Sequence, residues 1–213
     1  MTFTIWFTFF IAACIIAISP GSGAILSMSH GLSYGVKKTS ATILGLQIGL
    51  MLVFAIAGAG VGSLLLASEV AFNIVKVIGA LYLMYLGISQ WRAPVTTAPM
   101  VEAGDSGHAA PPFARRVLIG FLTNATNPKG IIFMVAVLPQ FISREAALLP
   151  QLLILGVTMC AIDLVVMHGY AFAASSMQRY FRDARALKKQ NRFFGGVLMA
   201  VGTALFFVKR HVG

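Results

Sequence analysis

The long apolar runs of this chain are interrupted at two places, which read Ser19-Pro20-Gly21-Ser22-Gly23 and Thr123-Asn124-Ala125-Thr126-Asn127-Pro128-Lys129-Gly130. In each stretch a residue that often caps helices, Ser19 or Asn127, stands directly before a proline. This order is typical of an N-cap followed by proline at the first helical position, so both stretches predict a helix start inside an apolar run. Inside a bilayer such a break persists only where it is buried in protein or lines a wet cavity.

The composition is that of a membrane protein. Hydrophobic residues make up 58% of the 213 residues, charged residues make up 10%, and the mean hydropathy is +0.87. Soluble domains contain about 25% charged residues, so no large soluble domain is expected beside the spans. The net charge of +10 comes from Lys and Arg in short segments between the apolar runs. This placement indicates a fixed orientation and contact with membrane lipids, and argues against nucleic acid as a partner.

A helix needs about 20 mostly apolar residues to cross a bilayer, and the chain offers six such runs. They cover residues 3–28, 41–66, 70–91, 117–142, 148–177 and 193–208. The first run has no Lys or Arg before Lys37, so we interpret it as a retained span and not as a signal peptide. A polar segment rich in Pro and Gly separates three runs from three. We therefore expect an all-α membrane protein, with a three-helix repeat at 1–91, a linker at 92–116 and a second three-helix repeat at 117–213.

The two interrupted runs open the two halves, so the first and fourth helices correspond, each broken at a proline. Because three is an odd number of spans, the second half must insert in the opposite direction, which predicts an inverted-topology repeat. Basic residues gather in the first, third and fifth connections, at Lys37, Lys38, Arg92, Arg115, Arg116, Arg179, Arg182, Arg185, Lys188, Lys189 and Arg192. The positive-inside rule places these connections in the cytoplasm and both termini outside.

The first break has the chemistry of a binding site for an anionic group. Pro20 fixes φ and has no N–H, while Gly21 and Gly23 let a ligand or another helix approach the backbone. A helix that starts here presents free N–H groups and a positive dipole end, which suit a carboxylate. A proline kink used only for packing is the alternative, and both readings apply equally to the second break. The candidate substrate-binding residues at the breaks are Ser19, Pro20, Gly21, Ser22, Gly23, Asn127, Pro128 and Lys129.

Asp163 is the only acidic residue deep inside a predicted span. A carboxylate at the centre of a span costs about 2.5–3.5 kcal/mol on insertion scales, so such residues usually face the protein interior and carry function. An ionised Asp163 could hold an ammonium group, and a neutral one could exchange a proton, so it is the candidate for both substrate binding and proton coupling. A structural ion pair or a hydrogen bond between helices is the alternative. Met167 and Tyr170 share its helix face, whereas His168 does not and is assigned a structural role.

Two further polar residues lie within the apolar runs. Lys129 follows the second break at a depth from which its side chain cannot easily reach either interface. It could lie in a wet cavity, bind a substrate carboxylate or pair with Asp163. Gln47 stands between Gly45 and Gly49, and either bonds to another helix or contacts a ligand, so it is also a candidate for substrate binding.

The remaining patterns carry less information about function. Cys14 and Cys160 lie in apolar runs and are interpreted as small buried hydrophobic residues. The chain shows no cluster of metal-ligand residue types, so neither a metal nor a cofactor is expected. Gly-x-x-x-Gly patterns at 45/49 and 58/62 let helices approach closely, which would permit a homodimer but serves internal packing equally well.

Several motifs occur together in an order that is specific. They are Ser19-Pro20-Gly21-Ser22-Gly23-Ala24-Ile25, Gly45-Leu46-Gln47-Ile48-Gly49, Gly79-Ala80-Leu81-Tyr82-Leu83 with Leu86-Gly87-Ile88, and Asn127-Pro128-Lys129 with Pro139-Gln140-Phe141. Through them the chain resembles the LysE/RhtB amino-acid exporters, over nearly its whole length. Most members of that family read Pro-Gly-Pro at the first break, and the Ser22 found here looks typical of the homoserine and homoserine-lactone efflux branch. Asp163 falls where the family shows an acidic residue in its fifth span.

The resemblance implies a multi-pass protein of the bacterial inner membrane that exports small amino acids or their derivatives. Homoserine and homoserine lactone are the implied substrates, with threonine as a further candidate, and the implied mechanism is secondary active transport by proton-coupled antiport. Two other classes remain alternatives. A passive channel or metal-ion exporter would also have several spans, although metal transport favours clustered His, Asp or Cys. An intramembrane serine protease would use Ser22 as nucleophile and His168 as base, but Pro20 replaces the first glycine of the usual Gly-x-Ser-Gly setting.

Overall fold

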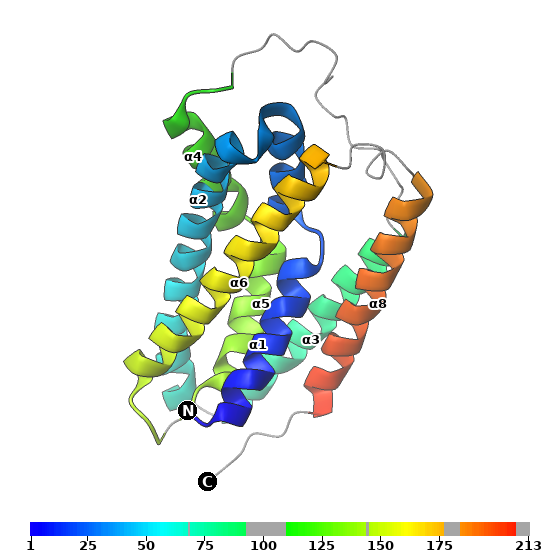
Figure 1. The fold of residues 1–213 in the computed structure, drawn as a ribbon. Coiled ribbons are helices and arrows are strands. Elements are labelled where there is room, and N and C mark those ends of the chain that lie inside the picture. The colour runs from blue at the N-terminus through cyan, green and yellow to red at the C-terminus, as the bar shows by residue number, and fades with distance from the viewer. Residues whose placement is uncertain (68, 93–109, 144, 177–183, 208–213) are drawn as a thin grey trace.

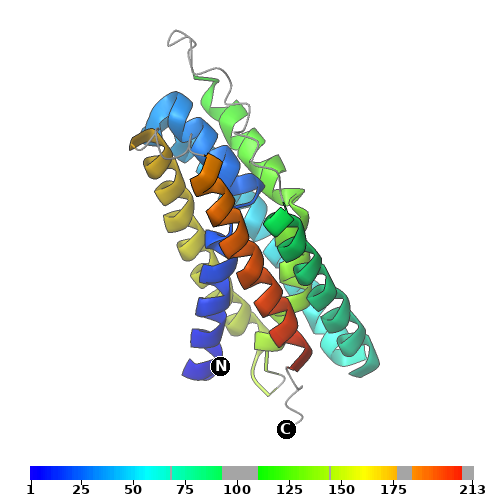
Figure 2. The same cartoon turned by 90° about the vertical axis from the view of Figure 1, so that its right-hand side faces the viewer.

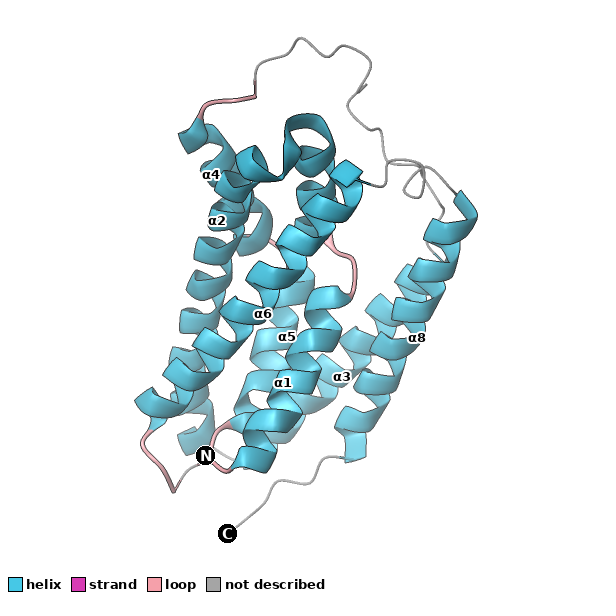
Figure 3. Ribbon diagram, in the orientation of Figure 1, coloured by secondary structure: helices cyan, strands magenta, loops and turns pink. Residues whose placement is uncertain are grey.

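The computed structural model describes residues 1–67, 69–92, 110–143, 145–176 and 184–207, which form a bundle of helices without strands (Figures 1 and 3). The elements in chain order are α1 (Phe3–Ile18), α2 (Ser22–Ala67), α3 (Glu69–Arg92), α4 (Phe113–Ala125), α5 (Pro128–Val137), the 3₁₀ helix η1 (Leu138–Phe141), α6 (Leu148–Ser176) and α8 (Ala184–Phe207). The predicted all-α fold is confirmed for this part of the chain.

Not every predicted span reaches the length of a membrane crossing. Two described helices, Ser22–Gly60 within α2 and Leu148–Ser176, are long and apolar enough to cross a bilayer. The helix pair α4 and α5–η1, bent by 50°, adds a third span if it is counted as one broken helix. The apolar helix α1 has only 16 residues. The count of six spans therefore stays a prediction. The linker residues 93–109, Arg179, Arg182 and Val208 lie outside the described residues.

The second break is built as the sequence predicts. α4 ends at Ala125 and α5 begins with Pro128 at its first position, directly after the N-cap Asn127. The Asn127 side chain accepts a hydrogen bond from the Lys129 backbone N–H at 3.1 Å, which satisfies one of the donors that every helix start leaves open. The predicted N-cap and first helical position are thus both confirmed at this break.

The first break is present, but its predicted cap is wrong. Ser19 is the C-cap of α1, where its N–H donates to the Ile15 carbonyl at 3.0 Å. The next helix begins at Ser22, and the Gly21 carbonyl accepts its first hydrogen bond, from the Ile25 N–H at 2.9 Å. The residue before a proline favours extended backbone, and Ser19 adopts it at ψ 119°, which ends α1 there. The start of α2 lies two residues beyond the proline.

A single glycine turns α2 through a corner that the sequence analysis did not predict. Gly35 has φ 74° and ψ 164°, the only positive φ among the described residues. Glycine adopts this conformation readily because it has no Cβ. Residues 29–40, expected to be a connection, are therefore helical on both sides of Gly35. The helical part at 22–34 completes the first interrupted run, and the part at 36–67 contains the predicted span 41–66.

Close helix packing in the bundle depends on glycine. α2 packs against α4 and α6, while α3 packs against α8 and α5 (Figure 2). A Cβ at Gly49 would lie 2.7 Å from the Phe121 carbonyl oxygen on α4, and one at Gly195 would lie 2.6 Å from the Gly87 carbonyl oxygen on α3. The 45/49 pattern is thus a close-packing face that α4 covers within the chain, and it gives no support to a homodimer, which stays a prediction.

Two apolar clusters make up the core. The larger cluster joins α1, α2, α5 and α6 around Phe9, Phe54, Phe133 and Leu155. The smaller cluster, around Leu46 and neighbouring residues, joins both helical parts of α2 to α6. The outer faces carry many exposed apolar side chains, including Ile56, Val157, Val165 and Phe172. A surface of this kind suits contact with lipid.

Candidate functional site

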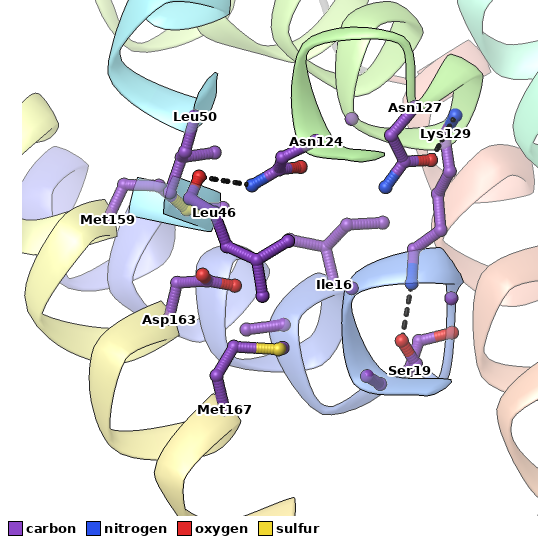
Figure 4. A pocket seen from close by; sticks show the side chains of 15 residues that line it. Ile16, Ser19, Leu46, Leu50, Asn124, Asn127, Lys129, Met159, Asp163 and Met167 are labelled. Atoms are coloured by element: carbon purple, nitrogen blue, oxygen red, sulfur yellow. Dashed lines mark hydrogen bonds between the residues drawn. The ribbon is translucent and has the colours of Figure 1, made fainter. Parts of the chain in front are cut away.

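A cavity of about 50 Å³ lies at the depth of both helix breaks, where the two core clusters meet (Figure 4). This volume has room for a few water molecules. Five helices and the two breaks contribute to its wall, with Ile16, Ala17, Ser19, Gly21, Gly23, Ala24, Leu46, Leu50, Asn124, Asn127, Lys129, Gly130, Met159, Asp163 and Met167. The N-terminal ends of α2 and α5 both border this cavity, so both helix breaks lie next to the same cavity.

Asp163 lines the cavity from α6 and is 7% exposed. Its Oδ2 accepts a hydrogen bond from the Gln47 side-chain amide at 2.7 Å, and the Gln47 Oε1 accepts a weaker one from the Cys160 thiol at 3.4 Å. Gln47 is buried and is not among the lining residues. It therefore positions the carboxylate from behind, and it joins α2 to α6 as the predicted interhelical bond would.

Lys129 connects the two breaks. Its backbone belongs to the first turn of α5, and its side-chain ammonium donates a hydrogen bond to the Ser19 carbonyl at the end of α1 (Figure 4). Both Lys129 and Asp163 are described, and the structure contains no ion pair between them. Of the three roles left open for Lys129, pairing with Asp163 is not formed. Lys129 lines the cavity, and its contact with water or with a substrate carboxylate stays a prediction.

The C-terminal end of α1 receives donors from the second half of the chain. The Tyr170 hydroxyl donates to the Ile18 carbonyl at 2.5 Å, next to the Ser19 carbonyl that Lys129 binds. Helix ends leave carbonyl groups without intrahelical partners and carry partial negative charge. Tyr170 and Met167 lie on the helix face of Asp163, as predicted, because Met167 lines the cavity and Tyr170 reaches the adjacent break.

Asn124 is a lining residue to which the sequence analysis assigned no role of its own. Its side-chain amide donates to the Leu46 carbonyl at 2.8 Å, which fastens α4 to α2 beside the cavity. The sequence feature that could have identified Asn124 is its polar side chain in an apolar run, three residues before the N-cap Asn127. Apolar lining residues such as Leu50 and Met159 gave no such signal, since apolar residues fill most positions of these runs.

Some predicted site residues lie beside the cavity without lining it. Pro20, Ser22 and Pro128 belong to the breaks but are not among the lining residues. The bonds of His168 go to the Ser40 hydroxyl at 3.1 Å and to the Leu164 carbonyl at 2.9 Å. The nucleophile–base pair of the protease alternative, Ser22 with His168, is therefore not formed. The described residues also contain no group of three or more His, Cys, Asp or Glu side chains that could hold a metal ion.

Comparison with known proteins gives a consistent result. The model of the family described as LysE type translocator matches residues 14–208. The homoserine/homoserine lactone efflux protein of Salmonella typhimurium is 39% identical over 213 residues, which covers 99% of this chain and 100% of that protein. An uncharacterized membrane protein of Vibrio cholerae is 38% identical over 98% of this chain and its own full length. The leucine efflux protein of an Enterobacter species is 30% identical over 97% of this chain and 96% of its own length.

No solved structure matches this chain significantly. The family match covers most of the chain, and it includes both helix breaks, Gln47 and Asp163. The residues that build the cavity therefore lie within the matched region. This chain belongs to the LysE type translocator family.

Proposed function

We propose that this protein is a secondary active exporter of small amino acids or their derivatives in the bacterial inner membrane. The observation that carries the proposal is the cavity in which one buried carboxylate and two interrupted helices meet. Related proteins are named as efflux proteins for homoserine, homoserine lactone and leucine, so these compounds are the substrates to test first. Threonine, an isomer of homoserine, is a further candidate. The cavity lining combines apolar side chains with a few polar groups, as is usual for small-molecule sites.

The polar groups around the cavity suit an amino acid. The N-terminal ends of α2 and α5 present the positive ends of helix dipoles, which favour the carboxylate of homoserine or the carbonyl oxygen of its lactone. Asp163 receives the substrate ammonium, or a proton when the substrate is absent. Because one carboxylate cannot hold both at once, export of substrate is coupled to entry of a proton.

The helix contacts support the proposed repeat. If 1–91 and 117–213 are inverted repeats joined by the linker 92–116, the second part of α2 corresponds to α6, and α3 corresponds to α8. In a pair of repeats related by a two-fold axis, corresponding helices near the axis contact one another. α2 indeed packs on α6, and α3 on α8. This arrangement is typical of transporters in which one half rocks against the other around a central site.

The basic residues support the proposed orientation. The Arg116 guanidinium donates hydrogen bonds to the Pro111 carbonyl at 2.9 Å and to the Lys38 carbonyl. The first and third connections of the predicted topology therefore meet at one end of the bundle. We assign this end to the cytoplasm, since Lys and Arg are enriched in cytoplasmic loops, where anionic lipid also attracts them.

Replacing Asp163 by asparagine tests the proposal. Asp163→Asn keeps the shape of the side chain but removes the charge that pairs with an ammonium. Loss of a charge-assisted hydrogen bond should weaken homoserine binding by about tenfold or more. Efflux should also lose its dependence on a pH gradient. Binding of labelled homoserine to purified protein in detergent measures the first effect, and release of labelled homoserine from liposomes that contain the protein measures the second.

The control for Asp163→Asn is Glu145→Gln, which makes the same chemical change at an exposed carboxylate. It should export homoserine like the unmodified protein. Size-exclusion chromatography before reconstitution verifies that both variants are folded, and equal amounts are then added to the liposomes. If Asp163→Asn exports homoserine with unchanged rate and pH dependence, Asp163 has no part in the mechanism.

A further inference from the structure

The ammonium of Lys129 occupies a position built for a cation. It donates to the Ser19 carbonyl, at the C-terminal end of α1, which carries partial negative charge. The adjacent Ile18 carbonyl accepts a hydrogen bond from the neutral Tyr170 hydroxyl. Among the lining residues the charged side chains are Lys129 and Asp163, and these two do not pair.

We propose that the Ser19 carbonyl is part of the ammonium subsite for the transported amino acid, and that the Lys129 side chain fills this subsite when the exporter is empty. This inference rests on the proposed function and adds a ligand contact to it. An amino-acid ammonium and the lysine ammonium have the same charge and the same three N–H donors, so one can replace the other on a carbonyl. The substrate then lies between the Ser19 carbonyl and Asp163, on opposite parts of the cavity wall.

The Lys129 side chain reaches Ser19 by passing a glycine. A Cβ built at Gly21 would lie 3.4 Å from the lysine Nζ and 3.5 Å from its Cδ. The lysine side chain thus packs along the Gly21 backbone, and even a Cβ there would meet it only at ordinary contact distance. The long lysine stem has several rotatable bonds, and the contact to Ser19 is made by its mobile end alone.

This inference and the alternative, in which Lys129 binds the substrate carboxylate, predict different changes in ligand affinity when Lys129 is removed. If Lys129 competes with the substrate ammonium, its removal tightens binding of any small ammonium compound. If it binds the carboxylate, its removal weakens binding of homoserine and leaves homoserine lactone, which has no free carboxylate, unaffected.

The experiment measures binding to purified full-length protein in detergent, with labelled homoserine and labelled homoserine lactone, each competed with methylammonium chloride or sodium acetate. In Lys129→Met, the methylammonium concentration that gives half-inhibition should be at least about threefold lower than in the unmodified protein, because the internal competitor is gone. Lactone binding should tighten by a similar factor. Lys129→Gln provides a second neutral variant if Lys129→Met does not fold. The matched control is Lys37→Met, at an exposed lysine.

A second measurement separates displacement of Lys129 from the general effect of removing a positive charge. Homoserine lactone, added to the unmodified protein, should increase the reaction of Lys129 with an amine-directed reagent, measured by mass spectrometry relative to Lys37. The ratio corrects for reagent that the lactone itself consumes. Protection of Lys129 by the ligand would overturn the inference, and so would an unchanged ratio.

The binding data give equally clear outcomes. Weaker homoserine binding with unchanged lactone binding in Lys129→Met overturns the inference and assigns Lys129 to the carboxylate. Unchanged or uniformly weaker binding of both ligands in folded Lys129→Met and Lys129→Gln also overturns it. A failure of the proposed function looks different, because the unmodified protein would then bind neither labelled ligand and would release no homoserine from liposomes.

Discussion

At the scale of single residues, Gln47 shows how an uncharged side chain can control a charged one. Its amide donates to Asp163 at 2.7 Å across the contact of α2 with α6. Gln47→Leu keeps a side chain of similar size but leaves the buried carboxylate without this donor. An unsatisfied buried polar group costs about 1–3 kcal/mol, so the free energy of unfolding should decrease by about that amount. Homoserine transport should decrease as well, because Asp163 is then held less firmly.

Thermal unfolding in detergent and homoserine release from liposomes measure the two effects. Gln140→Leu is the matched control, because the Gln140 amide bonds only to the Ala136 carbonyl of the preceding helix turn, at 2.9 Å. It should unfold and transport much like the unmodified protein. Equal behaviour of Gln47→Leu and Gln140→Leu would show that Gln47 does not position Asp163.

The site residues that the sequence predicts are those that are rare in their surroundings. Asp163 and Lys129 stand out because charge inside an apolar run is costly, and Asn127 stands out because it precedes a proline. Leu50 and Met159 also line the cavity, yet nothing distinguishes them from residues that merely fill the core. Periodicity tells which face of a helix is buried, but not which part of that face borders a cavity, since this depends on helices distant in sequence.

At the scale of elements, the two breaks show how far local rules reach. Asn127 and Pro128 start α5 through one side-chain bond and one fixed φ, both local properties. At the first break the same pattern of capping residue and proline ends α1 instead, and α2 begins only at Ser22, although Ser19 and Asn127 are both extended. The corner at Gly35 was not predicted, because residues 29–40 were expected to be a connection and not two helical segments. Only the packing of 22–34 and 36–67 shows that it turns.

Substitution of Gly35 tests whether this corner depends on the backbone alone. A Cβ at Gly35 would have no atom within 4 Å, so Gly35→Ala introduces no clash with neighbouring helices. The conformation at φ 74° and ψ 164° is nevertheless unfavourable for alanine, by about 1–3 kcal/mol. The free energy of unfolding should decrease by this amount, measured by thermal unfolding in detergent.

Gly169→Ala, within α6, is the matched control, because a Cβ there also has no atom within 4 Å and φ is not positive. It should leave stability unchanged or raise it slightly, as alanine favours helices. If Gly35→Ala is as stable as Gly169→Ala, the corner is not held by the glycine backbone, and the position of the 22–34 helix beside the cavity needs another cause.

At the scale of the whole molecule, composition predicts an all-helical membrane protein, whereas the number of spans is harder to derive. α1 is short for a bilayer at 16 residues, and the α4–α5 pair crosses as one span only if its 50° bend counts as a break within a single run. A hydropathy value averaged over a window of residues does not reveal such bends in a helix. The contact of Arg116 with the Lys38 carbonyl adds what charge counting alone lacks, namely that these basic segments are neighbours in space.

The last prediction concerns the coupling of transport to protons. Liposomes that contain the protein and labelled homoserine should release it faster when the outside is made more acidic than the inside. A proton entering down its gradient neutralises Asp163 and so favours the exit of the bound ammonium in the opposite direction. A protonophore that collapses the gradient should reduce release to the slower rate seen without a pH difference, and protein-free liposomes provide the baseline. Release that is independent of the gradient and shows no exchange with unlabelled external homoserine would identify a passive channel. In an antiporter, Asp163 must bind a proton or a substrate before the site can face the inside again, whereas a channel has no such requirement.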